Sequence, residues 1–184
     1  VVVTVHSMWD VVTRTVYRAL NAVYRWNRWG LVGTAVSEAA ARPIRRVAGP
    51  RVPVRVVSNG LDVAAWRPAG PRSRRDPGTP VHVVAVGRLA PRKQPLRLLK
   101  LLEETRRRVP ASVPLRATIV GDGPARASME RYLRTRGMGW VSMPGRYPRE
   151  RIRELLESAD VFVAPAPRES FGLAALEART AGVP

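Results

Sequence analysis

Residues 161–184 read Val161-Phe-Val-Ala-Pro-Ala-Pro-Arg-Glu-Ser-Phe-Gly-Leu-Ala-Ala-Leu-Glu-Ala-Arg-Thr-Ala-Gly-Val-Pro184, and they decide the fold that we expect. The apolar run at the start, Val161–Ala164, indicates a short buried strand, which the following prolines end because proline cannot donate a hydrogen bond to a sheet. From about Ser170 the apolar residues recur at helical spacing, and Ser170 is available as the N-cap. The stretch predicts a strand, a loop and a helix that begins where a parallel sheet opens its ligand crevice.

The loop and the first turn of this helix suit an anionic ligand that is rich in hydroxyl groups. The backbone N–H groups of Ser170, Phe171 and Gly172 have no intrahelical partners at a helix start, and the helix dipole favours an anion there. Glu169 and Glu177 can accept hydrogen bonds from hydroxyl groups. At ~1.5 Å per residue the two carboxylates should lie roughly 10 Å apart. A retaining glycosidase pair is closer, at ~5 Å, so we interpret the two as separate contacts to a sugar nucleotide.

The same stretch resembles the C-terminal signature of the family-4 retaining glycosyltransferases of GT-B fold. The resemblance rests on Glu169-x7-Glu177 with Phe171-Gly172, and on Glu177-Ala178-x-x-Ala181-Gly182-x-Pro184. It implies that Glu169 contacts hydroxyl groups of the donor sugar, that Glu177 holds the ribose, and that the N–H groups of residues 170–172 contact sugar and diphosphate. The alternative is that both glutamates are simply solvated near a surface helix.

A second candidate segment follows the predicted strand Val81–Val86. Gly87 leaves room for a phosphate, Arg88 offers a forked set of donors, and Lys93 lies at the mouth of the next predicted helix. The segment Val86-Gly-Arg-Leu-x3-Lys93 resembles the donor-phosphate motif of the family. The resemblance implies that Arg88 and Lys93 neutralise the leaving diphosphate. The family usually has glycine after this lysine, and Gln94 departs from that pattern.

A glycine pair follows the next predicted strand, Leu115–Val120. The sequence Gly121-Asp-Gly-Pro124 lacks the third glycine of a dinucleotide fingerprint, because Arg126 stands at that position, and this disfavours NAD. Gly-x-Gly-Pro at this place is typical of the resembled family. The resemblance implies that Gly121 and Gly123 lie near the base of the nucleotide.

The chain opens on Val1–Val5, a β-branched run that predicts a strand buried on both faces of a parallel sheet. His6 follows at its carboxyl end, where it could reach a hydroxyl group of the sugar or of the acceptor. In the family a histidine here approaches the donor sugar, which the resemblance carries to His6, although Ser7 departs from the usual neighbour. A purely structural histidine is the alternative.

Residues 10–29 predict a basic helix with aromatic side chains. Such a helix could lie on an anionic membrane and would suit a lipid-linked acceptor. The alternative, which we favour, is an ordinary crossover helix that packs one face on the sheet. Further along, residues 31–37 and 54–57 predict strands, Ser37 predicts an N-cap, and Ser58-Asn59-Gly60 predicts a turn.

The predicted fold class is α/β, a GT-B arrangement of two doubly wound, Rossmann-like parallel-sheet domains, both incomplete in this chain. Residues 1–66 would form the C-terminal part of an acceptor-side domain, and 81–184 the N-terminal part of a nucleotide-sugar-binding domain. Residues 67–80, rich in Pro, Gly and Arg, would form the interdomain linker. We therefore expect a fragment of a longer enzyme that is inactive alone.

The composition excludes several classes of protein. The 184 residues contain no cysteine and only 2 histidines, so disulfides, thiolate metal sites and a histidine metal cluster are not expected. No apolar run is long enough to span a bilayer. The net charge of +18 is carried almost entirely by arginine, as in proteins from GC-rich genomes, and would attract anionic lipid, nucleic acid or nucleotides. No recognisable nucleic-acid-binding module accompanies it.

We therefore expect a retaining glycosyltransferase that moves a sugar from a UDP- or GDP-sugar to a hydroxyl group of a glycan, lipid-linked or small-molecule acceptor. No metal and no further cofactor would be required. The protein would be cytoplasmic and could also lie on the inner face of the plasma membrane. A nucleotide-binding module of the same fold without transfer activity and a basic nucleic-acid-binding protein are the alternatives.

Overall fold

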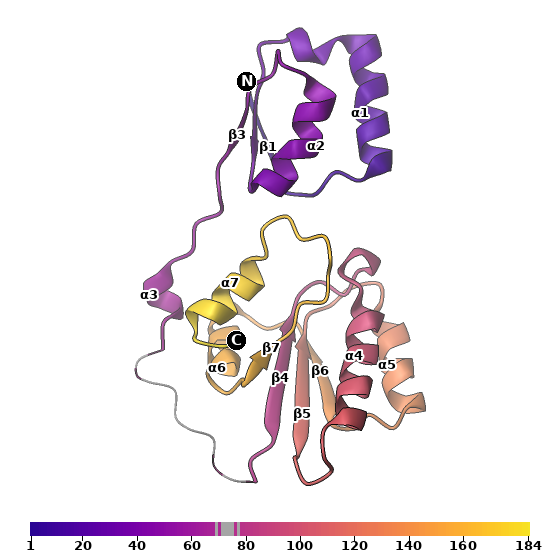
Figure 1. Ribbon diagram of the computed structural model, residues 1–184, viewed down its shortest axis with the longest axis vertical. Coiled ribbons are helices and arrows are strands. Elements are labelled where there is room, and N and C mark those ends of the chain that lie inside the picture. Colours follow the sequence, from indigo (N-terminus) through magenta and orange to yellow (C-terminus); the bar gives the residue numbers. More distant parts are fainter. Residues whose placement is uncertain (69, 71–75, 77) are drawn as a thin grey trace. The chain divides into compact units, whose positions relative to one another are not determined.

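The structure is a computed structural model, and it describes residues 1–68, 70, 76 and 78–184 (Figure 1). The chain divides into two compact units. The first unit comprises Val1–Gly60 and Arg168–Gly172, and the second comprises Leu61–Pro167 and Leu173–Pro184. Part of the predicted linker, residues 69, 71–75 and 77 with Arg72, Arg74 and Arg75, lies outside the described residues.

The first unit is built on a parallel sheet in the order β1-β2-β3. Its strands are β1 (Val2–Val5), β2 (Val32–Ala35) and β3 (Val54–Val56). In β1 the prediction of a strand is confirmed, but the prediction of burial on both faces is wrong. Val2 is 65% and Val3 is 46% exposed, and because successive side chains of a strand point to opposite faces, β1 is covered fully on neither face.

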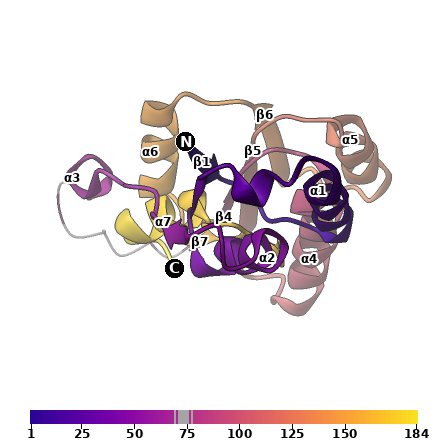
Figure 2. The ribbon, with the colours of Figure 1, turned by 90° about the horizontal axis from the view of Figure 1, so that it is seen from above.

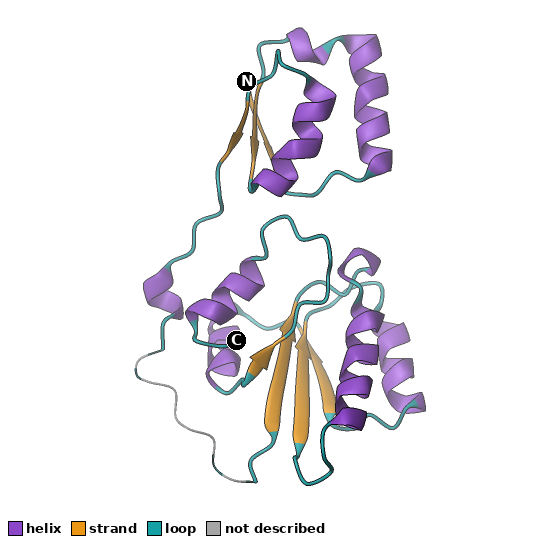
Figure 3. Ribbon diagram, in the orientation of Figure 1, coloured by secondary structure: helices purple, strands orange, loops and turns teal. Residues whose placement is uncertain are grey.

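Two helices lie on one side of this sheet (Figure 3). These are α1 (Val11–Tyr24), which the short 3-10 helix η1 (Trp26–Arg28) follows, and α2 (Glu38–Ala48). The predicted N-cap is confirmed, since the Ser37 hydroxyl accepts a hydrogen bond from the Ala40 N–H at 3.2 Å. Helix α2 buries Ala40, Ala41, Ile44, Val47 and Ala48. All of α1 is described, and none of its residues is buried.

The predicted turn at residues 58–60 is wrong. Neither Asn59 nor Gly60 has a positive φ, and no turn is assigned there. The chain instead runs on to a short helix, α3 (Val63–Trp66), whose first turn is capped by the Asp62 carboxylate at 3.2 Å from the Ala65 N–H. The sequence analysis missed α3 because four residues are too few to show a helical period.

The second unit contains a parallel sheet in the order β6-β5-β4-β7. Its strands are β4 (Val81–Val86), β5 (Leu115–Val120), β6 (Val141–Gly145) and β7 (Val161–Phe162). The helices are η2 (Pro91–Lys93), α4 (Pro95–Arg108), α5 (Arg126–Thr135), α6 (Arg149–Glu157) and α7 (Leu173–Thr180). Strand β7 is shorter than the predicted run Val161–Ala164.

Helices cover both faces of this sheet, and each face has its own core (Figures 1 and 2). Val83 and Ala85 of β4 pack toward α4 and α5, while Val84 packs toward α6 and α7. This alternation arises because successive side chains of a strand point to opposite faces. The predicted α/β fold class with parallel sheets is confirmed, and the sheet of the second unit is doubly wound.

The boundary between the units falls at Gly60, six residues before the predicted end of the first domain at Trp66. The reason is that Trp66 is only 2% exposed and packs in the core of the second unit with Leu156 and Ala178. The assignment of the two parts to an acceptor-side and a donor-side domain stays a prediction.

Candidate functional site

The loops at the carboxyl ends of β4 and β5 hold several residues of the predicted donor site. Hydrogen bonds join these loops directly. Gly87 donates its N–H to the Val120 carbonyl at 3.0 Å, and Leu89 donates to the Asp122 carbonyl at 2.9 Å. Gly121 in turn donates to the Gly145 carbonyl at 2.7 Å. The second unit thus brings the predicted residues Gly87, Arg88, Gly121 and Gly123 together at one edge of its sheet.

Both glycines of the loop after β5 are required by packing. A Cβ on Gly121 would lie 1.9 Å from the Gly87 carbonyl oxygen, and a Cβ on Gly123 would lie 2.6 Å from the Leu89 carbonyl oxygen. Their φ angles, +141° and +156°, are also ones that residues with a side chain rarely adopt. The Gly-x-Gly pattern therefore has a structural cause, which the sequence analysis did not recognise.

The two predicted cations follow β4 within a few residues of each other. The Arg88 side chain is exposed, and Lys93, the last residue of η2, is half-buried just before α4. Gln94 joins η2 to α4 with φ +52° and ψ +49°, the left-handed conformation that glycine adopts most easily. Where the resembled family usually has a glycine, this chain therefore has a glutamine in a conformation that favours glycine.

Helix α7 begins at Leu173, not at Ser170 as predicted. Gly172 has a φ of +80°, which is not helical and delays the helix, so Ser170 is not its N-cap. Ser170 donates its N–H to the Glu169 carboxylate at 3.2 Å. One of the three N–H groups predicted to face a ligand therefore has a partner within its own loop.

Glu177 is half-buried in the second turn of α7. Burial raises the pKa of its carboxyl group above the ordinary value, and the nearby positive charge of Arg149 partly offsets this effect. Glu177 belongs to the second unit together with Arg88 and Lys93, whereas Glu169, Ser170, Phe171, Gly172 and His6 belong to the first.

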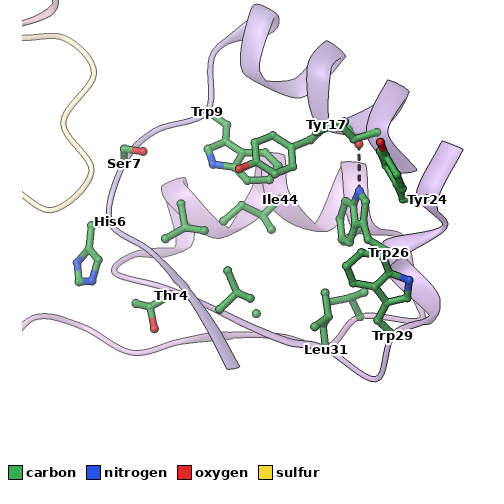
Figure 4. A pocket seen from close by; sticks show the side chains of 16 residues that line it. Thr4, His6, Ser7, Trp9, Tyr17, Tyr24, Trp26, Trp29, Leu31 and Ile44 are labelled. Atoms are coloured by element: carbon green, nitrogen blue, oxygen red, sulfur yellow. Dashed lines mark hydrogen bonds between the residues drawn. The ribbon is translucent and has the colours of Figure 1, made fainter. Parts of the chain in front are cut away.

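The first unit contains a cavity of about 680 Å³ between β1, β2, α1 and α2 (Figure 4). Its wall is apolar and aromatic. Trp9 and Tyr17 stack with ring centroids 4.3 Å apart, and the Trp26 indole N–H donates to the Tyr17 carbonyl at 3.2 Å. Figure 4 shows His6 and Ser7 at one end of the cavity, away from the cluster of aromatic rings.

The chain next to this cavity is strongly basic. Between Val11 and Val36 the sequence contains no aspartate or glutamate and four arginines: Arg14, Arg18, Arg25 and Arg28. Several apolar side chains of α1 are exposed beside them, among them Val12 at 70% and Val23 at 73%. Helix α1 therefore combines positive charge with an uncovered apolar surface.

Among the described residues, no helix is long and apolar enough to cross a membrane. Within the same residues, no group of His, Cys, Asp and Glu side chains is arranged to hold a metal ion.

A parallel sheet with helices on both faces and glycine-containing loops at its carboxyl edge defines the class of α/β folds that bind ligands at that edge. The sequence comparison is more specific, because residues 68–184 match the family described as Glycosyl transferases group 1. The chain belongs to this family.

Individual relatives agree with this assignment. The chain is 37% identical over 144 residues to a D-inositol 3-phosphate glycosyltransferase of Corynebacterium efficiens, in a match that covers 71% of this chain and 34% of the relative. It is 36% identical over 134 residues to a GDP-mannose-dependent alpha-(1-6)-phosphatidylinositol dimannoside mannosyltransferase of Mycobacterium tuberculosis, covering 68% of this chain and 32% of the relative. The chain thus spans about a third of the length of these relatives.

The fold is shared with solved structures. The crystal structure of Anabaena Alr3699/HepE in complex with UDP and glucose superposes with a TM-score of 0.77 at 22% identity, covering 100% of this chain and 51% of that one. Sucrose-phosphate synthase from Thermosynechococcus elongatus gives a TM-score of 0.75 at 20% identity, with 100% of this chain and 48% of that one covered. The predicted GT-B fold class is confirmed.

Proposed function

We propose that the protein to which this chain belongs is a retaining glycosyltransferase of family 4 that uses a UDP- or GDP-sugar. The single observation that supports this most strongly is the joined pair of loops after β4 and β5, which hold Arg88 at the carboxyl edge of a parallel sheet in a chain of this family. Lys93 follows in the same segment. Fixed cations at such a place stabilise negative charge that develops on a departing diphosphate.

In the proposed reaction the bond between the anomeric carbon and the diphosphate oxygen breaks. The acceptor hydroxyl oxygen forms a bond to the same carbon on the same face, and its proton passes to the departing diphosphate. Atoms and charge balance without a metal or a further cofactor. We assign donor-sugar contacts to Glu169 and His6, ribose contacts to Glu177, and diphosphate contacts to the backbone of Gly87 and of Ser170, Phe171 and Gly172.

We further propose an acceptor that is a glycan or is linked to a lipid. The basic helix α1, with exposed valines beside an aromatic cavity, suits peripheral contact with an anionic membrane. A cytoplasmic protein on the inner face of the plasma membrane would meet such an acceptor. The phosphatidylinositol dimannoside named for the Mycobacterium tuberculosis relative is an acceptor of this kind.

Calorimetric titration of the chain with UDP, GDP and a single-stranded oligonucleotide tests the donor site. We expect one nucleoside diphosphate to bind. Arg88→Ala should weaken its affinity by about tenfold or more, because a hydrogen bond to a charged group contributes about 1.5–3 kcal/mol. Glu177→Gln should weaken it as well. Arg134→Ala removes the same charge from an exposed site at the far end of α5 and should leave the affinity unchanged.

Equal effects of Arg88→Ala and Arg134→Ala, or binding of the oligonucleotide alone with steep salt dependence, would favour a basic nucleic-acid-binding protein. If the active enzyme is assayed, Arg88→Ala should lower turnover more than it weakens acceptor binding. A protein that binds the nucleotide but does not consume any donor sugar would be a binding module of the same fold.

A further inference from the structure

The last residue of β5 and the loop after it hold the loop that carries Arg88 on both sides of that residue. Before Arg88, the Gly87 N–H donates to the Val120 carbonyl at 3.0 Å. After it, the Leu89 N–H donates to the Asp122 carbonyl at 2.9 Å, and the Leu89 carbonyl accepts the Ala125 N–H at 2.9 Å. Three hydrogen bonds from one neighbouring segment therefore fix the backbone position from which the Arg88 side chain extends.

The two glycines allow this contact. With the first side-chain carbon only 1.9 Å from the Gly87 carbonyl oxygen, an alanine at 121 would push away the residue before Arg88. An alanine at 123 would push away the residue after it, since its Cβ would lie 2.6 Å from the Leu89 carbonyl oxygen. Both obstacles are backbone atoms, which cannot swing aside as a flexible side chain does.

The Asp122 side chain stabilises the loop after β5 by a hydrogen bond within that loop. Its Oδ1 accepts the Gly123 N–H at 2.7 Å, while its main-chain carbonyl accepts the Leu89 N–H. A carboxylate in this loop would by its charge alone disfavour a diphosphate near Arg88. Its presence is therefore explained better by the geometry that it maintains than by contact with an anion.

We propose that Gly121, Asp122 and Gly123 are positioning residues that act on the donor diphosphate through Arg88, instead of contacting the nucleotide themselves. This inference rests on the proposed function for the role of Arg88. The geometric part, in which the loop after β5 fixes the loop after β4, does not depend on that role and can be tested without a ligand.

Hydrogen exchange of the ligand-free chain tests the geometric part. The amides of Gly87 and Leu89 should exchange slowly in the unaltered chain and at least tenfold faster in Gly121→Ala and Gly123→Ala, while amides within β4 keep their protection. Gly139→Ala is the matched control, because a Cβ on Gly139 meets nothing within 4 Å. Unchanged exchange at both amides in folded variants would overturn the inference.

Calorimetry with UDP and GDP, compared with uridine and guanosine, tests the route through Arg88. Gly121→Ala should weaken the binding of the nucleoside diphosphate by about as much as Arg88→Ala does. It should leave the binding of the corresponding nucleoside unaffected. The double variant Gly121→Ala/Arg88→Ala should then lose little more than either single variant. Additive losses, or a loss of nucleoside binding, would instead indicate direct contact with the nucleotide and overturn the inference.

Asp122 provides a milder pair of variants in case the alanine substitutions prevent folding. Asp122→Ala removes the hydrogen bond to the Gly123 N–H and should weaken diphosphate binding several-fold. Asp122→Asn keeps an oxygen acceptor and should retain the affinity. If the carboxylate acted only by its charge, both variants would bind the diphosphate more tightly, and the inference would be wrong. Failure of the unaltered chain to bind either diphosphate would count against the proposed function, and the exchange result would still decide the geometry.

Discussion

At the scale of single residues, His82 is the polar side chain that the sequence analysis left unexplained. It lies in β4 and is 2% exposed. Its Nε2 is 2.8 Å from the Thr118 hydroxyl, and its Nδ1 is 3.1 Å from both oxygens of Ser158. Burial lowers the pKa of His82, the charge of Arg116 lowers it further, and the Ser158 carbonyl and the charge of Asp160 act in the opposite direction. The neutral imidazole thus joins β4, β5 and the end of α6.

This lowered pKa predicts a loss of stability in mild acid. Below about pH 6.5, the ordinary histidine pKa, the unfolded chain binds a proton more readily than the folded chain does. The free energy of unfolding therefore decreases as the pH is lowered, until the pH passes the lower pKa of the folded state. Urea unfolding between pH 7 and pH 5 should show this fall, and His82→Gln should reduce it. His6→Gln, which alters the exposed second histidine, is the control.

Glu177 contributes with the opposite sign over a more acidic range. Because its pKa is raised in the folded state, stability from this group falls as pH rises from the ordinary value through the raised one.

A pH dependence that is identical in the unaltered chain and in His82→Gln would show that protonation of His82 does not couple to folding.

At the scale of elements, the junction between η2 and α4 carries backbone strain. Gln94 occupies the left-handed region, which costs a residue with a side chain about 1–2 kcal/mol. Gln94→Gly should therefore stabilise the second unit by about 0.5–1 kcal/mol, after the entropy cost of glycine is subtracted. The measurement is the free energy of unfolding in urea.

Gln94→Ala is the control for the lost side chain. The Gln94 Oε1 accepts a hydrogen bond from Arg97 at 3.1 Å, and both the glycine and the alanine variant lose this exposed contact. Only glycine relieves the strain, so the difference between the two variants isolates the backbone term. Equal stability of the glycine and alanine variants would mean that the junction is not strained.

Helix α7 shows why element boundaries are hard to predict. The apolar spacing after Ser170 is helical, and the helix exists, but it starts only after Gly172 turns to a positive φ. Glycine is compatible with both a first helical turn and a left-handed residue, so the sequence alone could not choose between them.

At the scale of the whole molecule, the segment that contains Trp66 belongs to the second unit because Trp66 packs in the core of that unit. Its indole is 2% exposed, the Arg149 guanidinium lies 5.1 Å from the ring centroid, and its Nε1 has no hydrogen-bond partner among the described residues. We therefore expect Trp66→Ala to destabilise the second unit by about 3–5 kcal/mol. Trp66→Phe should cost considerably less, because it removes only an unpaired N–H and part of the ring.

Urea unfolding of the full chain measures this prediction. Trp29→Ala is the matched control, since Trp29 is 61% exposed in the first unit and its loss should cost well under about 1 kcal/mol. If Trp66→Ala proved no more costly than Trp29→Ala, the packing of residues 61–66 in the second unit would not contribute to its stability.

The sequence by itself determined the features that depend on neighbouring residues. Apolar and β-branched runs indicated the parallel strands, Ser37 indicated the start of α2, and the segments after β4 and β5 indicated loops with Arg88 and the glycine pair. These patterns are local because strand period, helix period and capping each involve only a few consecutive residues.

Only the tertiary structure decided which distant segments meet. In the folded chain β1 lies at an edge of its sheet, and Trp66 packs in the core of the second unit. His82 forms a hydrogen bond with Ser158, which is 76 residues away in the chain. The tertiary structure also placed Gly121 against Gly87, so that the glycine pair has a packing role. The physical reason is the same in each case, because burial and close contact depend on which surfaces face each other after folding.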